Sequence, residues 1–378
     1  MVGGAGLKIW GFTGTNGKTT CTWIAAAFIN ACPGRKCGYI TTVECNDGAG
    51  SFHTGYTTPP LARLKEIFAA MELNGCTDCV MEVSSHAIHQ RRTGETVFSG
   101  GAFTNLSEDH LDYHKTMEEY FRVKLSFAER MPPLAPYAVC TDGSGGGEML
   151  EACRAIAGLN VIAVSAADPD FDLSELKLVG AYNRSNVLTA AALACAAGVP
   201  RATVQAEIPK LTPRWGRLEK IENPRVAADV YVDFAHTPDG LEKVLGAARG
   251  FTRGKLWVVF GAGGDRDPMK RPLMGAACAR LADRLVLTSD NPRSEDPMRI
   301  IAQVAEGIAS VLGEVPPEVC RIEPDRAKAI AFALANSAAG DVVIVAGKGH
   351  ETTQEICGVK HPFDDREQVA AFAAAEQK

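Results

Sequence analysis

The chain lacks the features that mark nucleic-acid-binding and membrane proteins. Its 378 residues contain no block of basic residues and carry a net charge of −6, so we do not expect nucleic acid as a partner. They also contain no signal-peptide pattern and no apolar run long enough to cross a bilayer. With 46% hydrophobic and 22% charged residues, the composition is that of a globular protein with room for two or three domains. We therefore expect a cytoplasmic protein that does not contact the membrane.

A regular cysteine pattern is also missing. The twelve cysteines are irregularly spaced, and several lie in apolar runs, as Cys195 does. Only Cys76 and Cys79 have the spacing of a metal or redox pair, but no second Cys or His pair accompanies them, and Cys79 opens an apolar segment. We expect reduced cysteines that act as small buried hydrophobes.

The sequence does contain a glycine-rich segment near its start, residues 11–20 (GFTGTNGKTT). An apolar strand is expected over residues 7–10 and a helix over residues 21–28. Glycines let backbone N–H groups converge on an anion, and a helix N-terminus adds a favourable dipole. In such a loop Lys18 can pair with the β- and γ-phosphates of a nucleotide, and the Thr19 hydroxyl can bind Mg²⁺. Phe12, however, stands where a usual P-loop has its first glycine.

Strand and helix patterns alternate through the rest of the chain, which predicts α/β domains with parallel sheets. Proline and glycine interrupt a helical region at residues 211–217, and a new α/β series follows. The predicted fold class is therefore α/β, with a P-loop ATPase domain built on a parallel-rich sheet (residues 1–213) and a C-terminal Rossmann-like domain (residues 214–378). The strands expected in the second domain are residues 230–232, 256–260, 284–288 and 342–345, with a helix over residues 239–248.

Three segments of the first domain hold groups that suit phosphate chemistry. Glu82 follows an apolar strand, at the sheet edge where ligands of open parallel sheets bind, and is either a Mg²⁺ ligand or a solvated strand-end residue. Residues 103–114 are dense in histidines and carboxylates, which suit either a divalent cation or a capped surface turn. Lys124 alone is typical of a surface lysine on an amphipathic helix. Because the glycine-rich segment, Glu82 and residues 103–114 lie in one domain, we favour the functional interpretation of Glu82 and of residues 103–114. For Lys124 only a resemblance to a known family would change the interpretation as a surface lysine.

Four segments of the second domain follow strands and should gather at one sheet edge. Asp233 suits either a ribose hydroxyl or a helix cap. The loop 261–267 (GAGGDRD) lacks the G-x-G-x-x-G spacing of a dinucleotide site, but its Arg266 can pair bidentately with a carboxylate. Residues 290–293 (DNPR) and 347–351 (GKGHE) add cations, an amide and a carboxylate. This combination suits an amino acid that bears both carboxylate and ammonium groups.

Taken together, these segments resemble the Mur ligase family of ATP-dependent amide-forming enzymes. Within it they are most similar to the members that add the third residue of the peptidoglycan stem peptide. The resemblance rests on residues 11–20, 57–59, 82–86 with Gln90 and Arg92, 105–114, 180–186, 216–219, 233–238, 261–275, 290–293 and 347–351.

The resemblance implies transfer of the ATP γ-phosphate to a substrate carboxylate, followed by attack of an amino-acid amine on the acyl phosphate. It further implies ATP and two Mg²⁺ ions as cofactors, with Lys124 carbamylated. The residues implied to act in catalysis are Lys18, Glu82, His110 and Lys124, and those implied to bind metal are Thr19, Glu82, His110 and Lys124. Those implied to bind the nucleotide are Gly14, Thr15, Asn16, Gly17, Lys18, Thr19, Thr20, Asn186 (adenine), Arg217 (phosphates) and Asp233 (ribose).

The resemblance also implies two substrate sites. Residues 290–293 match the form of diaminopimelate-adding members, in which an arginine pairs with the distal carboxylate that lysine lacks. The donor residues implied are Arg266, Asp290, Asn291, Arg293, Gly347 and Glu351, and the acceptor residues are Thr57, Thr58, Ser84, Gln90 and Arg92.

Two departures from the family pattern leave the acceptor open. The chain starts at the first strand of the ATPase domain, without the family's uridine-nucleotide-binding domain, and residues 168–177 look short. The acceptor is either a muramoyl-peptide or γ-glutamyl precursor, bound with help from a separate acceptor-binding protein or domain, or a UDP-free small molecule of a specialised pathway. The alternative from another class is a non-catalytic nucleotide-binding regulator that keeps the Mur ligase fold.

Overall fold

The computed structural model describes residues 6–167 and 169–372, and the chain divides into two compact units. Unit 1 is Met1–Thr212 and unit 2 is Pro213–Lys378. Each unit has its own sheet and hydrophobic core.

Unit 1 is built around an eight-stranded sheet in the order β4-β3-β2-β5-β1-β6-β7-β8. All pairings are parallel except those of β3, which pairs antiparallel with β2 and β4. The strands are β1 (Lys8–Thr13), β2 (Cys37–Ile40), β3 (Cys45–Asn46), β4 (Ser51–Phe52), β5 (Asp78–Glu82), β6 (Gly100–Phe103), β7 (Pro136–Cys140) and β8 (Asn160–Val164). The helices are α1 (Lys18–Asn30), α2 (Leu61–Leu73), α3 (Ser85–His89), α4 (Leu111–His114), α5 (Met117–Glu129), α6 (Gly146–Arg154), α7 (Ala181–Ala196) and α8 (Arg201–Glu207), followed by the 3₁₀ turn Ile208–Lys210.

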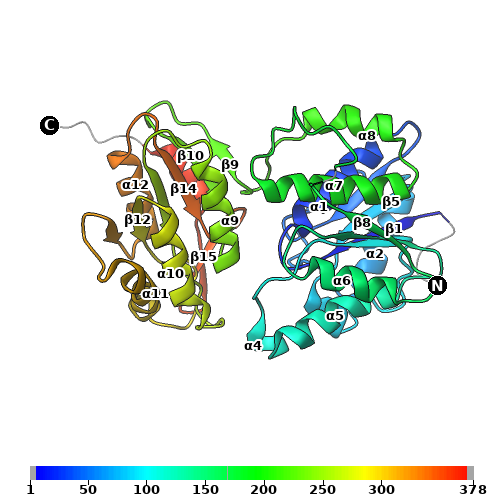
Figure 1. Ribbon diagram of the computed structural model, residues 1–378, viewed down its shortest axis with the longest axis horizontal. Helices are drawn as coiled ribbons and strands as arrows, with labels where there is room; N and C mark the ends of the chain where they lie inside the picture. Colours follow the sequence, from blue (N-terminus) through cyan, green and yellow to red (C-terminus); the bar gives the residue numbers. More distant parts are fainter. Residues whose placement is uncertain (1–5, 168, 373–378) are drawn as a thin grey trace. The chain divides into compact units, whose positions relative to one another are not determined.

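Helices cover both faces of this sheet, as parallel sheets require. Helices α1 and α7 pack together on one face, and α5 and α6 lie on the other (Figure 1). Both faces of the central strands are therefore buried: every residue of β5 is, and so is all of β1 after Lys8. Because β1 lies between β5 and β6, the segments that follow these three strands meet at one edge.

The first strand is longer than the sequence pattern suggested. Strand β1 runs to Thr13, so Phe12 is a strand residue and not part of the loop. It pairs in register with Glu82 and Ala102, and its side chain is fully buried. The phosphate-type loop thus begins at Gly14, and a phenylalanine at position 12 contributes to the core between sheet and helices.

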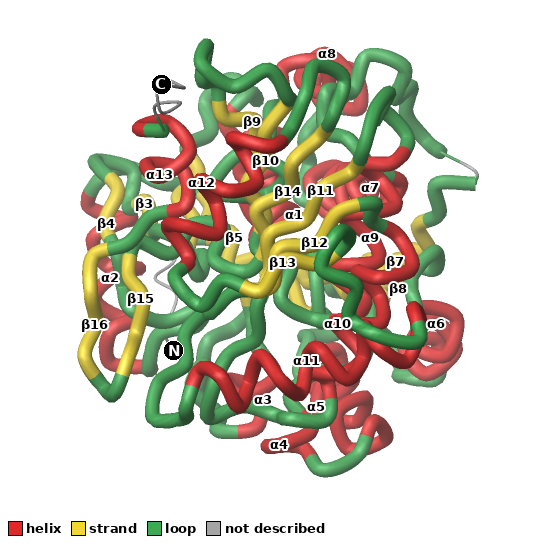
Figure 2. The backbone as a smooth tube through the Cα atoms, turned by 90° about the vertical axis from the view of Figure 1, so that its left-hand side faces the viewer, coloured by secondary structure: helices red, strands yellow, loops and turns green. Residues whose placement is uncertain are grey.

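Unit 2 contains a six-stranded sheet in the order β13-β12-β11-β14-β10-β9, parallel except for the edge strand β9. A separate antiparallel hairpin is formed by β15 and β16 (Figure 2). The strands are β9 (Glu219–Ile221), β10 (Asp229–Asp233), β11 (Leu256–Phe260), β12 (Arg284–Leu287), β13 (Cys320–Ile322), β14 (Val342–Ala346), β15 (Thr353–Ile356) and β16 (Val359–Pro362). The helices are α9 (Pro238–Arg249), α10 (Lys270–Leu281), α11 (Pro297–Leu312), α12 (Arg326–Asn336) and α13 (Asp365–Ala371).

Alternate residues of the unit 2 strands build two cores. Val258 and Phe260 pack with α9, α10 and α11, whereas Trp257 and Val259 pack with α12 and α13. This alternation follows from the two-residue period of a strand, and it makes β11 buried along its whole length.

The remaining expectations concern cysteines, membranes and one short segment. All twelve cysteines are free; nine are buried, but Cys195 and Cys32 are only partly buried and Cys357 is exposed. No helix within the described ranges is both long and apolar enough to cross a membrane. Residues 169–177 contain no helix or strand, and Asp168 lies outside the described residues.

Candidate active-site clusters

The glycine-rich loop of unit 1 is hydrogen-bonded to the segment that follows β6. Thr15 N donates to Asn105 O (2.8 Å), and Asn16 N donates to Asn105 Oδ1 (3.0 Å). Gly14 and Gly17 have φ values of +147° and +84°, which residues other than glycine rarely adopt. Asn105 was not singled out from the sequence, because an asparagine after a strand has no pattern that reveals a partner 89 residues away.

The start of α1 combines a cation with a helix N-terminus. Lys18 Nζ donates to Gly14 O (3.0 Å) and Thr15 O (2.8 Å), so its side chain folds back over the loop. Thr19 and Thr20 are buried in the first turn of the helix. The backbone N–H groups of such a first turn, with a lysine beside them, form a favourable environment for an anion.

Asn186 of α7 closes the other side of the loop. A Cβ atom at Gly17 would lie 2.4 Å from Asn186 Oδ1, a separation that real Cβ atoms do not show. The Asn186 amide in turn donates to Asn183 Oδ1 at 3.2 Å. Residue 17 therefore favours glycine for its backbone angle, and a Cβ there would also require the Asn186 amide to shift.

Lys124 is buried, so its sequence-based interpretation as a surface lysine is wrong. Its side chain is 1% exposed, its Nζ donates to Gly14 O (2.8 Å), and it lies 4.3 Å from the ring centre of Tyr120. Burial lowers the pKa of Lys124 well below its usual value, and the positive charge of Lys18 lowers it further, with Asp109 opposing. The structure thus places a buried amine directly under the glycine-rich loop.

Tyr120 links this amine to the loop and to a buried histidine. Its hydroxyl lies 3.2 Å from Thr15 Oγ1, and its ring stacks on His114, which is fully buried and 2.9 Å from Ser85 Oγ. Burial raises the pKa of Tyr120 above its usual value. The sequence analysis did not identify Tyr120, although its position four residues before Lys124 puts it on the same face of α5.

Glu82 is buried too, which overturns its interpretation as a solvated strand-end residue. Only 1% of it is exposed, and its carboxylate accepts from Thr42 N (2.8 Å) and Thr42 Oγ1 (3.3 Å). Thr42, which follows β2, also escaped the sequence analysis. A buried carboxylate whose only described hydrogen bonds are to one threonine keeps lone pairs for a further cation.

The expected acceptor residues form two groups around Glu82 and α3. The Thr42 hydroxyl lies 2.9 Å from that of Thr57, and Thr58 Oγ1 donates to Glu82 O (2.9 Å) while accepting from Ser84 N (3.0 Å). Ser84 caps α3. At the end of that helix Arg92 Nε donates to Gln90 Oε1 (2.8 Å), and Gln90 Nε2 donates to Tyr113 O–H (3.1 Å).

His110 lies in the turn before α4 with a left-handed backbone (φ +58°). Its ring nitrogen is 3.5 Å from Asp109 Oδ2, and its ring meets that of His86 edge-on at 4.9 Å. Burial lowers its pKa, and the charges of His86, Lys18 and Lys124 act in the same direction, against Asp109. A neutral imidazole is the form that binds a metal ion.

Within the described residues no group of three or more His, Cys, Asp or Glu side chains is arranged around a metal position. A Mg²⁺ ion bound with substrate phosphates keeps several waters and takes only one or two protein ligands. Glu82 and the Thr19 hydroxyl carry oxygen atoms of the kind that Mg²⁺ prefers, whereas the His110 ring offers only nitrogen atoms, which Mg²⁺ binds less readily.

In unit 2, Asp233 fixes the turn after β10 and does not cap the next helix. Its two carboxylate oxygens accept from Leu218 N (2.6 Å) and Ala235 N (2.7 Å), while Thr237 caps α9. Burial raises the pKa of Asp233, and Arg217 opposes that shift. The Arg217 guanidinium lies 4.5 Å over the Phe234 ring, so both expected nucleotide residues of this unit border one turn.

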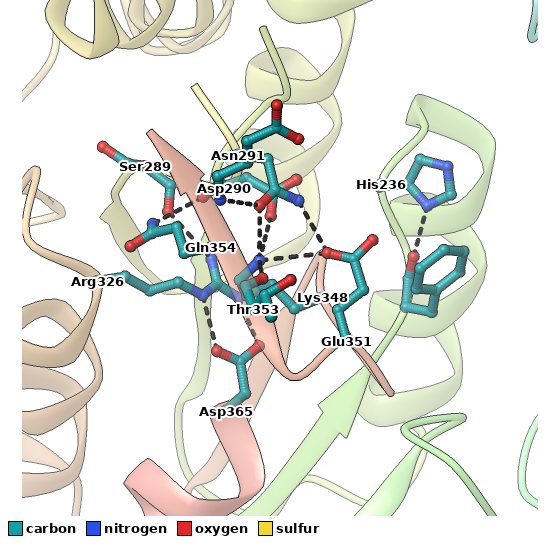
Figure 3. A network of polar contacts seen from close by, with 12 residues as sticks. His236, Ser289, Asp290, Asn291, Arg326, Lys348, Glu351, Thr353, Gln354 and Asp365 are labelled. Atoms are coloured by element: carbon teal, nitrogen blue, oxygen red, sulfur yellow. Dashed lines mark hydrogen bonds and ion pairs between the residues drawn. The ribbon is translucent and has the colours of Figure 1, made fainter. Parts of the chain in front are cut away.

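The segments after β12 and β14 form a buried polar network (Figure 3). Asn291 Nδ2 donates to Glu351 Oε2 (2.8 Å), and Lys348 Nζ donates to Asn291 Oδ1 (3.0 Å), Glu351 Oε2 (3.2 Å) and Thr353 O (2.8 Å). Asp290 Oδ1 is buried, makes no hydrogen bond to any described residue, and lies 3.7 Å from the Lys348 ammonium. Gly347 (φ +121°) lets the chain turn beside Asp290.

A fully buried ion pair supports this network from behind. Arg326 donates to both carboxylate oxygens of Asp365 (2.8 and 2.7 Å) and to Ala346 O (2.9 Å), and neither side chain is exposed. Arg326 thereby joins α12, α13 and the end of β14 (Figure 3). Neither partner was identified from the sequence, because each alone is an ordinary residue at a helix start.

The two expected arginines border Gly263. A Cβ there would lie 3.1 Å from Arg293 Nη1 and 3.8 Å from Arg266 Cγ. Arg293 Nη1 donates to Gly264 O (2.5 Å), and its Nε is 3.9 Å from Glu355 Oε2. Arg266 is exposed and makes no hydrogen bond or ion pair to the described residues, so the structure does not bring it into the network.

Known protein families match both units of the chain. Residues 12–173 match the Mur ligase middle domain, and residues 216–349 match the glutamate ligase domain of Mur ligases. The UDP-N-acetylmuramoyl-L-alanyl-D-glutamate–2,6-diaminopimelate ligase of Ralstonia nicotianae is 40% identical, over 98% of this chain and 76% of that protein. The enzyme of the same name from Geobacillus kaustophilus is 39% identical, over 98% of this chain and 79% of that protein.

Solved structures give the same result. A structure of a 2,6-diaminopimelate ligase of that name is 32% identical, has a TM-score of 0.62, and covers 96% of this chain and 77% of that one. Folylpolyglutamate synthase of Mycobacterium tuberculosis has a TM-score of 0.69 over 99% of this chain and 92% of that one, and at 19% identity it shows a likeness of fold alone. The predicted α/β fold and the predicted family are both confirmed, and the chain belongs to the Mur ligase family.

Proposed function

We propose that the protein is an ATP-dependent ligase that joins 2,6-diaminopimelate to a muramoyl-dipeptide in peptidoglycan synthesis. The observation that carries this proposal is the polar network after β12 and β14. It places the Asn291 amide, the Glu351 carboxylate and, on the adjoining turn, the Arg293 guanidinium around one sheet edge. Relatives that are 39–40% identical over 98% of the chain are named as diaminopimelate ligases.

We propose that residues 1–213 form the ATP-binding domain and residues 214–378 the C-terminal domain. The loop Gly14, Thr15, Asn16 and Gly17 would surround the phosphates, with Lys18 as their cation and Thr19 and Glu82 as Mg²⁺ ligands. ATP and Mg²⁺ supply an activated γ-phosphoryl group and neutralise its charge. Thr20 and Asn186 would complete the nucleotide contacts of unit 1, and Asp233 and Arg217 those of unit 2.

Lys124 is proposed to be carbamylated and, with His110, to help hold a second Mg²⁺ ion. The lowered pKa supports this, because only the neutral amine of a lysine reacts with CO₂. The reaction forms an N–C bond and releases one proton, so the amine becomes an anionic carbamate. In that form Lys124 would offer oxygen ligands from a rigid, buried position beside the loop.

Each substrate has its own group of residues in this proposal. Thr57, Thr58, Ser84, Gln90 and Arg92 would contact the acceptor peptide. Asp290, Asn291, Arg293, Gly347 and Glu351 would bind the amino acid, with Glu351 on the distal ammonium and Arg293 on the distal carboxylate. Arg266, which is exposed, would have to turn toward the bound amino acid. An Arg293 guanidinium that meets no substrate carboxylate would disfavour lysine, which has no distal carboxylate.

The test is ATP-dependent ligation followed by mass spectrometry. The purified protein is incubated with ATP, Mg²⁺ and diaminopimelate, L-lysine or another amine, against UDP-linked and UDP-free γ-glutamyl acceptors. We expect a diaminopimelate amide and stoichiometric ADP. A product with UDP-free acceptors alone would assign the protein to a specialised pathway. ATP binding without ADP release for every pair would favour the non-catalytic regulator.

A further inference from the structure

We infer that Lys348 is a positioning residue of the amino-acid site. Its ammonium determines which way the Asn291 amide and the Glu351 carboxylate face, and through them the preference for an amino acid with an ammonium and a carboxylate at its distal end. This inference rests on the proposed function. It concerns a residue that touches none of the proposed substrates and acts through two that do.

The ammonium of Lys348 is saturated by its surroundings. A lysine has three N–H groups, and these reach Asn291 Oδ1, Glu351 Oε2 and Thr353 O at 2.8–3.2 Å. Its side chain is fully buried, and Figure 3 shows it at the meeting point of these bonds. With no exposed surface and no remaining donor, Lys348 cannot itself bind an amino acid in this arrangement.

The lysine fixes the orientation of the Asn291 amide. An ammonium can only donate, so the side that faces Lys348 must be the amide oxygen. Glu355 N donates to the same oxygen (3.0 Å). The amide nitrogen therefore faces Glu351 Oε2, 2.8 Å away, and cannot exchange places with the oxygen. Lys348 Nζ and Glu355 N together therefore fix the orientation in which the Asn291 amide nitrogen faces Glu351.

The same ammonium also fixes Glu351. Its Oε2 accepts from both Lys348 and Asn291, whereas Oε1 makes no hydrogen bond to the described residues and the side chain is 36% exposed. One carboxylate oxygen is thus anchored, and the other is left for a substrate ammonium. Without Lys348, the carboxylate could rotate, and Glu355 N alone would hold the orientation of the Asn291 amide.

Lys348 further connects these residues to the hairpin that supports Arg293. It donates to Thr353 O at the start of β15, and in the same hairpin Glu355 O accepts from Arg293 N (3.0 Å). Cys357 N donates to Arg293 O (2.6 Å). The groups proposed for the distal ammonium and the distal carboxylate are therefore held by one framework.

The experiment compares Lys348→Met with wild type in the ligation assay. Methionine keeps the unbranched apolar stem as far as Cε and removes the ammonium. We expect the KM for diaminopimelate to rise at least tenfold, the KM for ATP to change less than threefold, and the preference for diaminopimelate over L-lysine to fall at least tenfold. Lys220→Met removes a paired lysine of β9 that has no part in the network, and it should change none of these values.

A double-variant cycle separates positioning from general damage. If Lys348 acts through Asn291, the KM increase of Lys348→Met/Asn291→Ala should be far smaller than the product of the two single increases. If Lys348→Met does not fold, Lys348→Gln, which keeps a donor, is measured in its place and should lie between wild type and Asn291→Ala in selectivity. Multiplicative effects, or unchanged diaminopimelate KM and selectivity, would overturn the inference. A wild type that does not use diaminopimelate would contradict the proposed function instead.

Discussion

Each unit of this protein buries one lysine at the carboxyl edge of its sheet, and the two lysines have opposite surroundings. Lys124 donates to one carbonyl oxygen, lies over an aromatic ring and has a second lysine nearby. Lys348 is surrounded by an amide oxygen, a carbonyl and two carboxylates. Burial without a counter-charge favours a reactive neutral amine, whereas burial among acceptors favours a fixed cation. Unit 1 thus has a lysine suited to chemistry, and unit 2 has one suited to positioning.

The largest expected difference between the two lysines is in activity. Lys124→Met should lower kcat about 10²- to 10³-fold, which is the usual cost of removing one preorganised electrostatic group, while ATP binding stays within a few-fold of wild type. The steady-state rate of ADP release measures kcat, and calorimetric titration measures ATP binding. Lys65→Met, an exposed substitution on α2, is the control. Retention of wild-type kcat by Lys124→Met would remove Lys124 from the proposed chemistry.

Stability should change in different directions at the two sites. Lys124→Met replaces a buried amine, whose one hydrogen bond is to a carbonyl oxygen, by an apolar side chain, so the free energy of unfolding should be equal to that of wild type or higher. Lys348→Met leaves Glu351 and Asp290 without their cation and should lose about 1–3 kcal/mol. Urea unfolding of both variants at pH 7 makes the comparison. Equal losses at both sites would show that the surroundings of the two lysines do not differ as described.

The loop under which Lys124 lies can be tested with a pair of glycines. Gly17→Ala introduces a Cβ 2.4 Å from Asn186 Oδ1, whereas Gly34→Ala, at a similar φ of +78°, meets nothing within 4 Å. Left-handed strain of about 1–2 kcal/mol applies to both. Gly17→Ala should therefore be the less stable variant, by about 1 kcal/mol more, and should also bind ATP more weakly. Thermal unfolding and ATP titration that fail to separate the pair would contradict the proposed contact.

The smallest expected effect is on the pH dependence of stability. Because burial lowers the pKa of Lys124, the folded protein binds fewer protons than the unfolded chain between that lowered pKa and about 10.4. The stability of wild type should therefore rise with pH relative to Lys124→Met, by at most about 1.4 kcal/mol per pH unit. Unfolding in CO₂-free buffer at pH 7, 8 and 9 measures this. A constant difference would mean that the pKa of Lys124 is not lowered.

Much of the fold was predictable because alternating apolar segments specify a parallel α/β arrangement. Strand β11 and the helix after β10 lie where the pattern indicated. Gly14, Gly17 and Lys18 could be assigned to a loop before α1 because that assignment depends on local spacing. The burial of Glu82 and Lys124 could not, since it depends on Thr42 and Gly14, which are 40 and 110 residues away.

The buried charges that support the polar network after β12 and β14 were harder still to predict. Lys348 has one partner in Asn291, 57 residues earlier, and others in its own turn, and Arg326 has its partner in Asp365, 39 residues later. No periodic pattern connects such residues. What the sequence indicated was a set of candidate substrate-binding groups, and what the structure adds is the set of buried charges that hold those groups in place.

The most direct test of this account is the choice of amino acid by the wild-type protein. Ligation is measured with equal concentrations of meso-diaminopimelate and L-lysine in one reaction, with ATP, Mg²⁺ and a UDP-muramoyl-dipeptide, and both products are quantified by mass spectrometry. The account predicts that the diaminopimelate product exceeds the lysine product at least a hundredfold, because only diaminopimelate pairs with both Glu351 and Arg293. Equal products, or a majority of the lysine product, would contradict it.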